Sequence, residues 1–193
     1  AVCRRLDPLR RNGFGGFGVL DEINMAKNDA VSVLHASLDY RRCIDVPGYD
    51  KIDLHDAARF IGTMNYGYAG TKELNEALVS RFLVIDMPPQ NEETLEYIFR
   101  RKFPQIKENA LKQWIGLFMD LQTKAGNSEI TTKSLDLRGM LGALKAVSCG
   151  LHPALAVRMG VVNKCFDVFE KEIVQDVVMT RIPESWTTGD VFQ

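Results

Sequence analysis

The sequence lacks a net charge, a long apolar run and a recognisable cysteine pattern, and each absence excludes a class of protein. Its 24 Lys and Arg nearly balance its 25 Asp and Glu, so no overall field draws the chain to nucleic acid or to an anionic membrane. No apolar run approaches the roughly 20 residues that a membrane-spanning helix needs. The four cysteines and three histidines are scattered, without the spacing of a disulfide framework or a zinc site. We therefore expect a cytoplasmic protein without a membrane partner, in which any polyanion is bound only at a local site.

The composition and texture of the chain indicate a folded protein in two parts. Hydrophobic residues make up 46% and charged residues 25% of the sequence, which is the usual balance of a globular domain. Two consecutive prolines, Pro88 and Pro89, end an apolar run, and proline cannot lie within a central strand. We predict an α/β part over residues 1–88, a helical part over residues 89–180 and an irregular tail over residues 181–193.

In the first part, short apolar stretches alternate with helix-like segments. The stretches at 17–20, 59–64 and 83–87 each fit a buried parallel strand. Helices are predicted over 27–38 and 73–82. Between 43 and 54, alternating apolar and polar residues flank a Pro-Gly turn, which indicates a β-hairpin.

The second part follows a helical period. Asn91 is placed to cap a helix that has two glutamates in its first turn and three basic residues at its end. Further helices are predicted around Trp114, from about Asp136 to Gly150, and over 153–179. The expected core residues of the last stretch are Val161, Val162, Phe166, Phe169 and Ile173.

Two adjacent carboxylates follow the first predicted strand. Asp21 and Glu22 come directly after Gly18-Val19-Leu20, at the carboxyl end of the strand, where ligands bind in open α/β sheets. In nucleotide hydrolysis the first carboxylate of such a pair can hold Mg²⁺ through a water, and the second can polarise the attacking water. A strand that ends in a solvated Asp-Glu turn has the same local sequence, so the pair alone leaves both interpretations open.

Asn65 and Arg81 follow the second predicted strand and the helix after it. The amide of Asn65 can both donate to a phosphate oxygen and accept from water, although an ordinary turn also accounts for an asparagine there. Arg81 ends the helix predicted before the third strand. It can cap the helix dipole, or reach a neighbouring subunit and stabilise charge during phosphoryl transfer.

The order of these residues resembles the plan of an AAA+ ATPase. Asp21-Glu22, Asn65, Ser80-Arg81-Phe82 and Leu135-Asp136-Leu137-Arg138 stand in the order of Walker B, sensor one, arginine finger and sensor two. The segments 20–26, 39–42 and 63–78 are similar to the MoxR-type branch, which includes the CbbQ/NorQ-like and dynein-related ATPases. The resemblance covers about residues 12–175. It implies an α/β P-loop NTPase core, with an N-terminally incomplete parallel sheet, followed by an all-α lid.

The resemblance also implies cofactors, roles and partners. ATP and Mg²⁺ would be the cofactors, with Asp21 placing Mg²⁺, Glu22 activating water and Asn65 orienting that water. Arg138 would bridge nucleotide and lid, and Arg81 would act in the adjacent subunit of a homo-oligomeric ring, expected to be a hexamer. Relatives act as chaperones that activate or insert metal cofactors in client proteins, often beside a protein with a von Willebrand A domain.

One motif of these ATPases is missing from the sequence. No G-x-x-x-x-G-K-[ST] segment, whose backbone amides cradle the phosphates, occurs in the 193 residues. We therefore expect an N-terminally incomplete chain that is inactive alone and an ATPase when complete. Two other functions stay open, a non-hydrolysing AAA-like scaffold that lacks the loop and a nucleic-acid motor of the helicase type. The near-neutral charge and the acidic hairpin argue against the motor.

Overall fold

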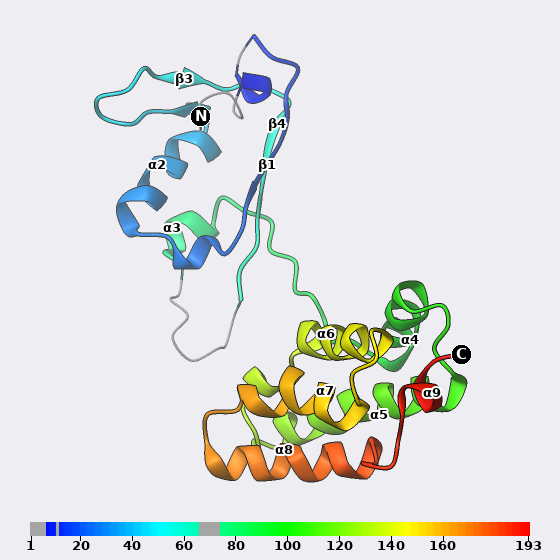
Figure 1. The fold of residues 1–193 in the computed structure, drawn as a ribbon. Coiled ribbons are helices and arrows are strands. Elements are labelled where there is room, and N and C mark those ends of the chain that lie inside the picture. The colour runs from blue at the N-terminus through cyan, green and yellow to red at the C-terminus, as the bar shows by residue number, and fades with distance from the viewer. Residues whose placement is uncertain (1–6, 11, 66–73) are drawn as a thin grey trace. The chain divides into compact units, whose positions relative to one another are not determined.

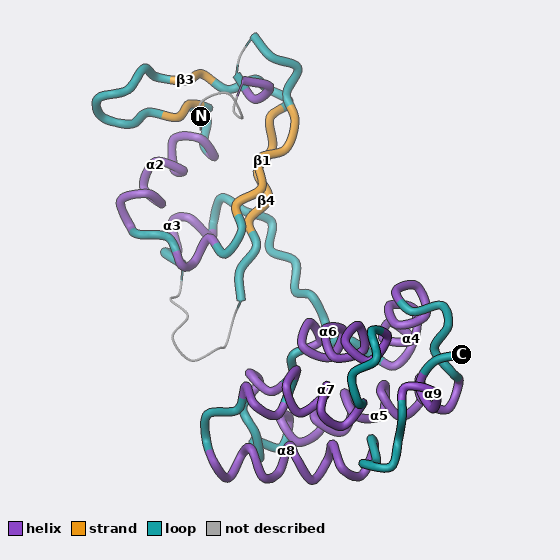
Figure 2. The backbone as a smooth tube through the Cα atoms, in the orientation of Figure 1, coloured by secondary structure: helices purple, strands orange, loops and turns teal. Residues whose placement is uncertain are grey.

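The computed structural model describes residues 7–10, 12–65 and 74–193, and the chain divides into two compact units. The first unit is Ala1–Met87 and the second is Pro88–Gln193, so the division falls at the two prolines. The first unit combines helices with short strands, whereas the second is helical (Figures 1 and 2). The chain is therefore a mixed unit with a small parallel sheet followed by a helical unit.

Two parallel strands form the centre of the first unit. β1 (Gly16–Leu20) pairs with β4 (Ala58–Gly62), in a register that runs from Gly16 opposite Ala58 to Leu20 opposite Gly62. The two strands therefore end at the same level. The described elements around them are η1 (Asp7–Leu9), η2 (Ile23–Met25), α2 (Asn28–Leu38), the antiparallel pair β2 (Cys43–Ile44) and β3 (Ile52–Asp53), and α3 (Glu76–Val79). The first two predicted strands, the helix at 27–38 and the hairpin are confirmed.

One face of this sheet is covered within the described part of the unit, and the other is bare. Leu20, Ala58 and Phe60 pack into two small apolar clusters, and α2 and α3 lie on one side of the two strands (Figure 1). Successive side chains of a strand point to opposite faces. On the second face Phe17, Val19 and Ile61 are 71%, 65% and 48% exposed, although parallel strands are normally covered on both faces.

The third predicted strand is wrong. Residues 83–87 form no strand in the described structure, and Leu83, Val84, Ile85 and Met87 are all strongly exposed. A strand requires a neighbour that accepts and donates its backbone hydrogen bonds, and no described strand pairs with this segment. The predicted helix at 73–82 is also shorter, because α3 covers only Glu76–Val79; residue 73 lies outside the described residues.

Arg42 joins three parts of the crossover between β1 and β4. Its guanidinium donates to the backbone carbonyls of Ser37 at 3.3 Å, His55 at 3.2 Å and Ala58 at 2.5 Å. Its own backbone has a φ of 47°, a left-handed conformation that is costly for a residue with a side chain. One arginine thus ties the end of α2 and the end of the hairpin to the start of β4.

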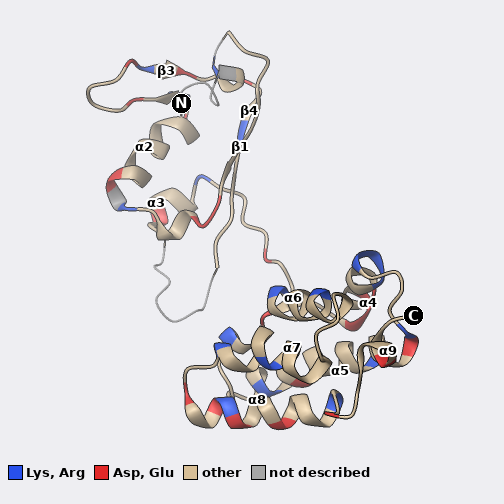
Figure 3. Cartoon of the chain, in the orientation of Figure 1, with Lys and Arg blue, Asp and Glu red and all other residues tan. Residues whose placement is uncertain are grey.

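The second unit buries its apolar residues between helices. Its elements are α4 (Glu92–Lys102), α5 (Glu108–Gly126), η3 (Thr132–Ser134), α6 (Leu137–Ser148), α7 (Pro153–Gly160), η4 (Val162–Lys164), α8 (Val168–Arg181) and α9 (Thr188–Val191). Asn91 accepts from the amide of Thr94, as predicted, and charges of opposite sign occupy the two ends of α4 (Figure 3). Trp114 and Phe99 are fully buried in the core. No described helix combines the length and apolar character that crossing a membrane requires.

Two expectations for the second unit require correction. Val161 and Val162 are buried as predicted, but Phe166 is 93% and Phe169 is 76% exposed. α8 begins after Asp167, so Phe166 precedes the helix, and the face that α8 buries carries Val174, Val177 and Val178. The tail is also not irregular throughout, because α8 continues to Arg181 and α9 follows. Val191 of α9 is fully buried, and its carbonyl accepts from the amide of Lys107 at 2.8 Å.

Replacing Arg42 by Ala is expected to loosen the crossover of the first unit. The substitution removes three hydrogen bonds to backbone carbonyls, for an expected loss of about 2 kcal/mol. The carbonyls of His55 and Ala58 keep a second donor, the amide of Ala58 and the guanidinium of Arg59. Both tryptophans, Trp114 and Trp186, lie in the second unit, so hydrogen exchange of peptides from residues 43–62 is the appropriate measurement. Arg42→Lys keeps the charge without the planar fork of donors and should exchange at an intermediate rate. Exchange in Arg42→Ala equal to that of the wild type would contradict this role.

Replacing Gly139 by Ala is expected to destabilise the second unit, because α6 and α7 touch there through their backbones. A Cβ at Gly139 would overlap the carbonyl oxygen of Gly160, and such overpacking costs about 1–3 kcal/mol or more. Gly142 lies in the same helix with nothing within 4 Å of its Cβ position, so Gly142→Ala should be neutral or stabilise by up to about 1 kcal/mol. Urea unfolding followed by tryptophan fluorescence measures both, and similar midpoints for the two variants would disprove the close approach.

Candidate active site

The carboxyl ends of β1 and β4 bring the predicted carboxylates and the predicted amide to one edge of the sheet. Leu20 ends β1 opposite Gly62, which ends β4. Asp21 and Glu22 follow the first strand, and Asn65 lies three residues beyond the second. The backbone pairing continues past the strands, with the amide of Thr63 donating to the carbonyl of Leu20 at 2.9 Å. These three predicted site residues therefore share one end of the parallel pair, and all three are exposed.

Thr63 contacts both carboxylate residues, and its side chain was not identified from the sequence as part of the site. Its hydroxyl donates to Oδ1 of Asp21 at 2.5 Å and accepts from the backbone amide of Glu22 at 3.2 Å. The carbonyl of Thr63 accepts from the amide of Ile23 at 3.0 Å. The only sequence signal is a hydroxyl residue directly after β4, and its meaning depends on the register of the two strands.

Glu22 has an unusual backbone conformation. Its φ of 51° and ψ of 46° lie in the left-handed region, which costs a residue with a side chain roughly 1–2 kcal/mol. The turn into η2 holds this conformation, since the carbonyl of Glu22 accepts from the amide of Met25 at 2.8 Å. Strained backbone of this kind clusters at functional sites, and here it directs the chain after β1 away from the strand axis.

Asn24 connects η2 to the segment after β4 and is the second residue whose role was not identified from the sequence. It is 4% exposed, and its Nδ2 donates to the backbone carbonyl of Asn65 at 3.2 Å. Its Oδ1 is buried without a hydrogen-bond partner among the described residues. Asn24 therefore fixes the backbone of Asn65, while the side chain of Asn65 stays at the surface.

Arg81 is held by its own unit in this structure. It lies two residues beyond the end of α3, so it follows the helix instead of ending it. Its guanidinium donates to the carbonyl of Ala77 and lies 4.0 Å from Oδ2 of Asp39, at the end of α2. Its described partners therefore do not include Asp21 or Glu22.

Asp39 holds a second arginine more tightly. The guanidinium of Arg41 donates to both carboxylate oxygens, with distances of 2.6–3.2 Å, and the amide of Arg41 donates to Oδ1 at 2.9 Å. These hydrogen bonds lower the pKa of Asp39 to about 2, with a smaller contribution from the charge of Arg81. Asp39 is therefore an anion over the whole physiological range and an anchor for the two arginines.

Arg138 belongs to the second unit, where it is the second residue of α6 and is exposed. Asp136 caps this helix by accepting from the amide of Gly139 at 2.8 Å, and it also accepts from Lys164. Burial raises the pKa of Asp136, but the bonds from Lys164 and Gly139 outweigh that effect and lower it. The start of the helix is thereby fixed with Arg138 in its first turn.

A buried glutamate stabilises the turn that leads into this helix. Glu170 of α8 is 9% exposed, and its Oε1 accepts from the amide of Thr131 at 3.0 Å, from the hydroxyl of Thr131 at 2.9 Å and from the hydroxyl of Ser134. A buried carboxylate is tolerated only when it is hydrogen-bonded in this way. The signal in the sequence was weak, because Glu170 lies in a helix with several other charged residues.

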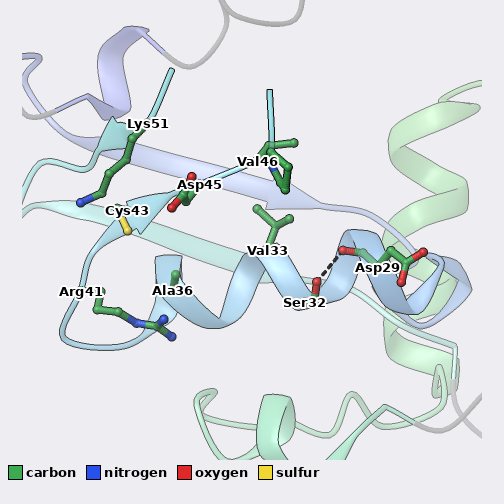
Figure 4. Close-up of a pocket in the computed structure, with 10 residues that line it drawn as sticks. Asp29, Ser32, Val33, Ala36, Arg41, Cys43, Asp45, Val46 and Lys51 are labelled. Atoms are coloured by element: carbon green, nitrogen blue, oxygen red, sulfur yellow. Dashed lines mark hydrogen bonds between the residues drawn. The ribbon is translucent and has the colours of Figure 1, made fainter. Parts of the chain in front are cut away.

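A separate cavity lies between α2 and the β2–β3 hairpin and contains none of the predicted site residues. Its volume is about 690 Å³, and carboxylates and cationic side chains both line it (Figure 4). Arg41 is already bound by Asp39, and Lys51 lies 3.4 Å from Asp53. Both cations are therefore already paired with carboxylates of the same unit. This makes the cavity a weaker candidate for binding an anionic ligand than the sheet edge is for binding a cation.

The carboxylates at the sheet edge suit a Mg²⁺ ion whose remaining ligands are waters and phosphate oxygens. Asp21 and Glu22 supply hard carboxylate oxygens at the surface, and Mg²⁺ is usually bound through one or two carboxylates together with waters and phosphates. Over the part of the chain that the structure describes, no three His, Cys, Asp or Glu side chains gather into a self-sufficient metal site. The sequence contains no G-x-x-x-x-G-K-[ST] loop, so the described residues of this edge fit the metal better than the whole nucleotide.

Comparison with known proteins identifies a similarity to an AAA domain in the first unit. Residues 6–82 match the family model of the AAA domain, dynein-related subfamily. The uncharacterized protein YojN of Bacillus subtilis (strain 168) is 31% identical over 167 residues, which cover 86% of this chain and 55% of that protein. An uncharacterized protein of Staphylococcus aureus (strain NCTC 8325 / PS 47) is 29% identical over 164 residues, covering 84% and 60%. The chain thus spans less than two thirds of the length of these relatives.

Removing Arg41 should raise the pKa of Asp39 more than removing Arg81 does. The hydrogen bonds from Arg41 are the largest cause of the low pKa, and the charge of Arg81 is the smallest. A depressed carboxyl pKa stabilises the fold above its ordinary value of 3.8, and the contribution is lost as the pH falls through about 2. Carboxyl-carbon NMR between pH 1.5 and 5 measures the titration in Arg41→Ala and Arg81→Ala. A larger shift in Arg81→Ala would show that Arg81 is the main partner.

Proposed function

We propose that this chain is the larger part of a MoxR-type AAA+ ATPase that binds and hydrolyses ATP as a remodelling chaperone. The observation that carries the proposal is the register of β1 and β4, because it brings Asp21, Glu22 and Asn65 to one sheet edge from positions more than 40 residues apart. Nucleotides bind at this edge in open α/β sheets. The match of residues 6–82 to an AAA domain supports the same assignment.

Each residue at the edge has a role that follows from its chemistry. Asp21 would help to hold Mg²⁺, which would supply positive charge near the phosphoryl group of ATP. Glu22 accepts a proton from the attacking water, and Asn65 keeps that water in line because an amide can accept and donate together. The exposure of all three side chains leaves them accessible to a nucleotide.

The arginines complete the proposed site from outside this edge. Arg81 would leave Asp39 and reach the nucleotide of the adjacent subunit, where an arginine finger contributes about 10³–10⁵ in rate. The 4.0 Å separation from Asp39 makes this a weaker ion pair than the 2.6 Å contact between Arg41 and Asp39, so Arg81 is the more easily released of the two arginines. Arg138, at the start of α6, would link the nucleotide to the helical unit, which serves as the lid. This arrangement requires a ring, and we expect a hexamer.

A further segment, outside this chain, would supply the phosphate-binding loop. The bare face of Phe17, Val19 and Ile61 and the exposed run at 83–87 are what a sheet presents when part of its cover and one of its strands are missing. The relatives are long enough to contain such a segment. We propose that it covers this face and carries a G-x-x-x-x-G-K-[ST] loop, and that the present chain alone does not turn over ATP.

The biological role rests on the resemblance to the MoxR-type branch. Members of that branch activate partner enzymes or insert metal cofactors into them, so a client protein and a von Willebrand A domain protein are the proposed partners. A non-hydrolysing scaffold is the second candidate, and the absence of the loop from these 193 residues favours it. The set of Asp21, Glu22, Asn65, Arg81 and Arg138 is the argument for hydrolysis, because a scaffold has no use for it.

Glu22→Gln in the complete protein should abolish turnover while ATP binding is retained. The amide keeps the size of the side chain but cannot accept the proton of water. Turnover is measured by phosphate release and binding by a fluorescent ATP analogue. Glu22→Gln with wild-type turnover would remove Glu22 from the mechanism, and a wild type that binds ATP without hydrolysing it would favour the scaffold.

Mixing Arg81→Ala subunits with Glu22→Gln subunits should restore part of the activity. In a mixed ring, some sites combine an intact Glu22 with an intact Arg81 from the neighbour. Arg41→Ala is the matched control, because Arg41 also binds Asp39 but is not proposed to reach the nucleotide. No recovery at any mixing ratio would place Arg81 outside the neighbour's site.

A further inference from the structure

We infer that Thr63 is a positioning residue for the proposed hydrolysis, and that its hydroxyl orients Asp21 and Glu22 together. This inference rests on the proposed function. One side-chain oxygen contacts the carboxylate of Asp21 at 2.5 Å and the backbone amide of Glu22 at 3.2 Å. No other described side chain hydrogen-bonds to the carboxylate of Asp21 or to the amide of Glu22.

The directions of the two hydrogen bonds are fixed by chemistry. An ionised carboxylate only accepts and a backbone amide only donates, so the hydroxyl must donate to Asp21 and accept from Glu22. A hydroxyl is a small group that can do both at once, and a serine would do so equally. Valine has nearly the same shape as threonine and can do neither, which makes the pair of substitutions a clean test.

The position of the hydroxyl is itself well fixed. The backbone amide of Thr63 donates to the carbonyl of Leu20 at 2.9 Å, and its carbonyl accepts from the amide of Ile23 at 3.0 Å. These bonds extend the ladder between β1 and β4 and do not involve the side chain. A valine at this position should therefore keep the backbone of the sheet edge in place.

The two hydroxyl bonds contribute to orientation more than to stability. Asp21, Glu22 and Thr63 are all exposed, so water can replace the lost bonds at little net cost to the fold. Glu22, however, has a left-handed backbone, and its amide would lose its described acceptor. Supporting hydrogen bonds to metal-site residues typically change metal affinity or activity by about 10–100-fold.

The test compares Thr63→Val with Thr63→Ser in the complete protein. Hydrogen exchange of the segment 20–24 reports the Glu22 amide in the absence of nucleotide. Binding of a fluorescent ATP analogue, with Mg²⁺ and with EDTA, separates contacts to the metal from contacts to the rest of the nucleotide. Phosphate release gives kcat, and the melting temperature monitors the fold.

Thr63→Val should exchange faster at 20–24, need about tenfold more Mg²⁺ and lose about tenfold or more in kcat. Its affinity for the analogue in EDTA and its melting temperature should match the wild type, and Thr63→Ser should resemble the wild type throughout. An active wild type with a Thr63→Val variant of equal kcat and Mg²⁺ requirement overturns the inference. Equal losses in both variants overturn it too, since the hydroxyl would then be irrelevant. A wild type that hydrolyses no ATP instead refutes the proposed function, and the role of Thr63 with it.

Discussion

The parallel pairing of β1 with β4 is the constraint on which the rest of the first unit depends. Two parallel strands cannot be joined by a tight turn, so the chain must cross over between them, and here residues 21–57 form that crossover. The crossover contains α2 and the hairpin, and it returns the chain to the end of the sheet at which β1 begins, so that β4 runs in the same direction. The pairing of Leu20 with Gly62 then makes Asp21 and Thr63 neighbours, although 42 residues separate them in sequence. A shift of one residue in this register would separate the hydroxyl from the carboxylate and expose the opposite faces of the strands.

The two units differ in the size of their hydrophobic cores. In the second unit a single core contains buried residues from all six helices, and Gly139 lets α6 approach α7 until the backbones meet. The described part of the first unit has two apolar clusters with three buried residues each, around Leu54 and around Leu78. Small cores need additional constraints. Arg42 supplies one by joining the end of α2 to the end of the hairpin and to the start of β4. The three hydrogen bonds of its guanidinium offset the cost of its left-handed backbone.

Much of this architecture could be predicted from the sequence, because the strongest signals are local. The apolar stretches before Asp21 and before Thr63, the Pro-Gly turn of the hairpin and the cap at Asn91 each depend on a few neighbouring residues. The failures have tertiary causes. Residues 83–87 have the apolar pattern of a strand, but pattern alone does not provide a partner. Phe166 and Phe169 have the composition of a core, yet the start of α8 at Val168 leaves them at the surface. Thr63 was not identified because its role depends on register, and register is not a local property.

The exposed sheet edge and the exposed sheet face have different explanations. At the edge, the hydroxyl of Thr63 is hydrogen-bonded to the carboxylate of Asp21 in contact with water, where such a bond adds little to stability. The fold would tolerate many other residues there, so the presence of two carboxylates, a hydroxyl and an amide is better explained by chemistry than by folding. On the face, Phe17, Val19 and Ile61 gain nothing from contact with water. Their exposure is costly for a unit with such small clusters, and a covering segment would remove that cost. If that segment also carries the phosphate-binding loop, then completing the core and completing the active site are one event, and nucleotide binding and stability of the first unit are coupled.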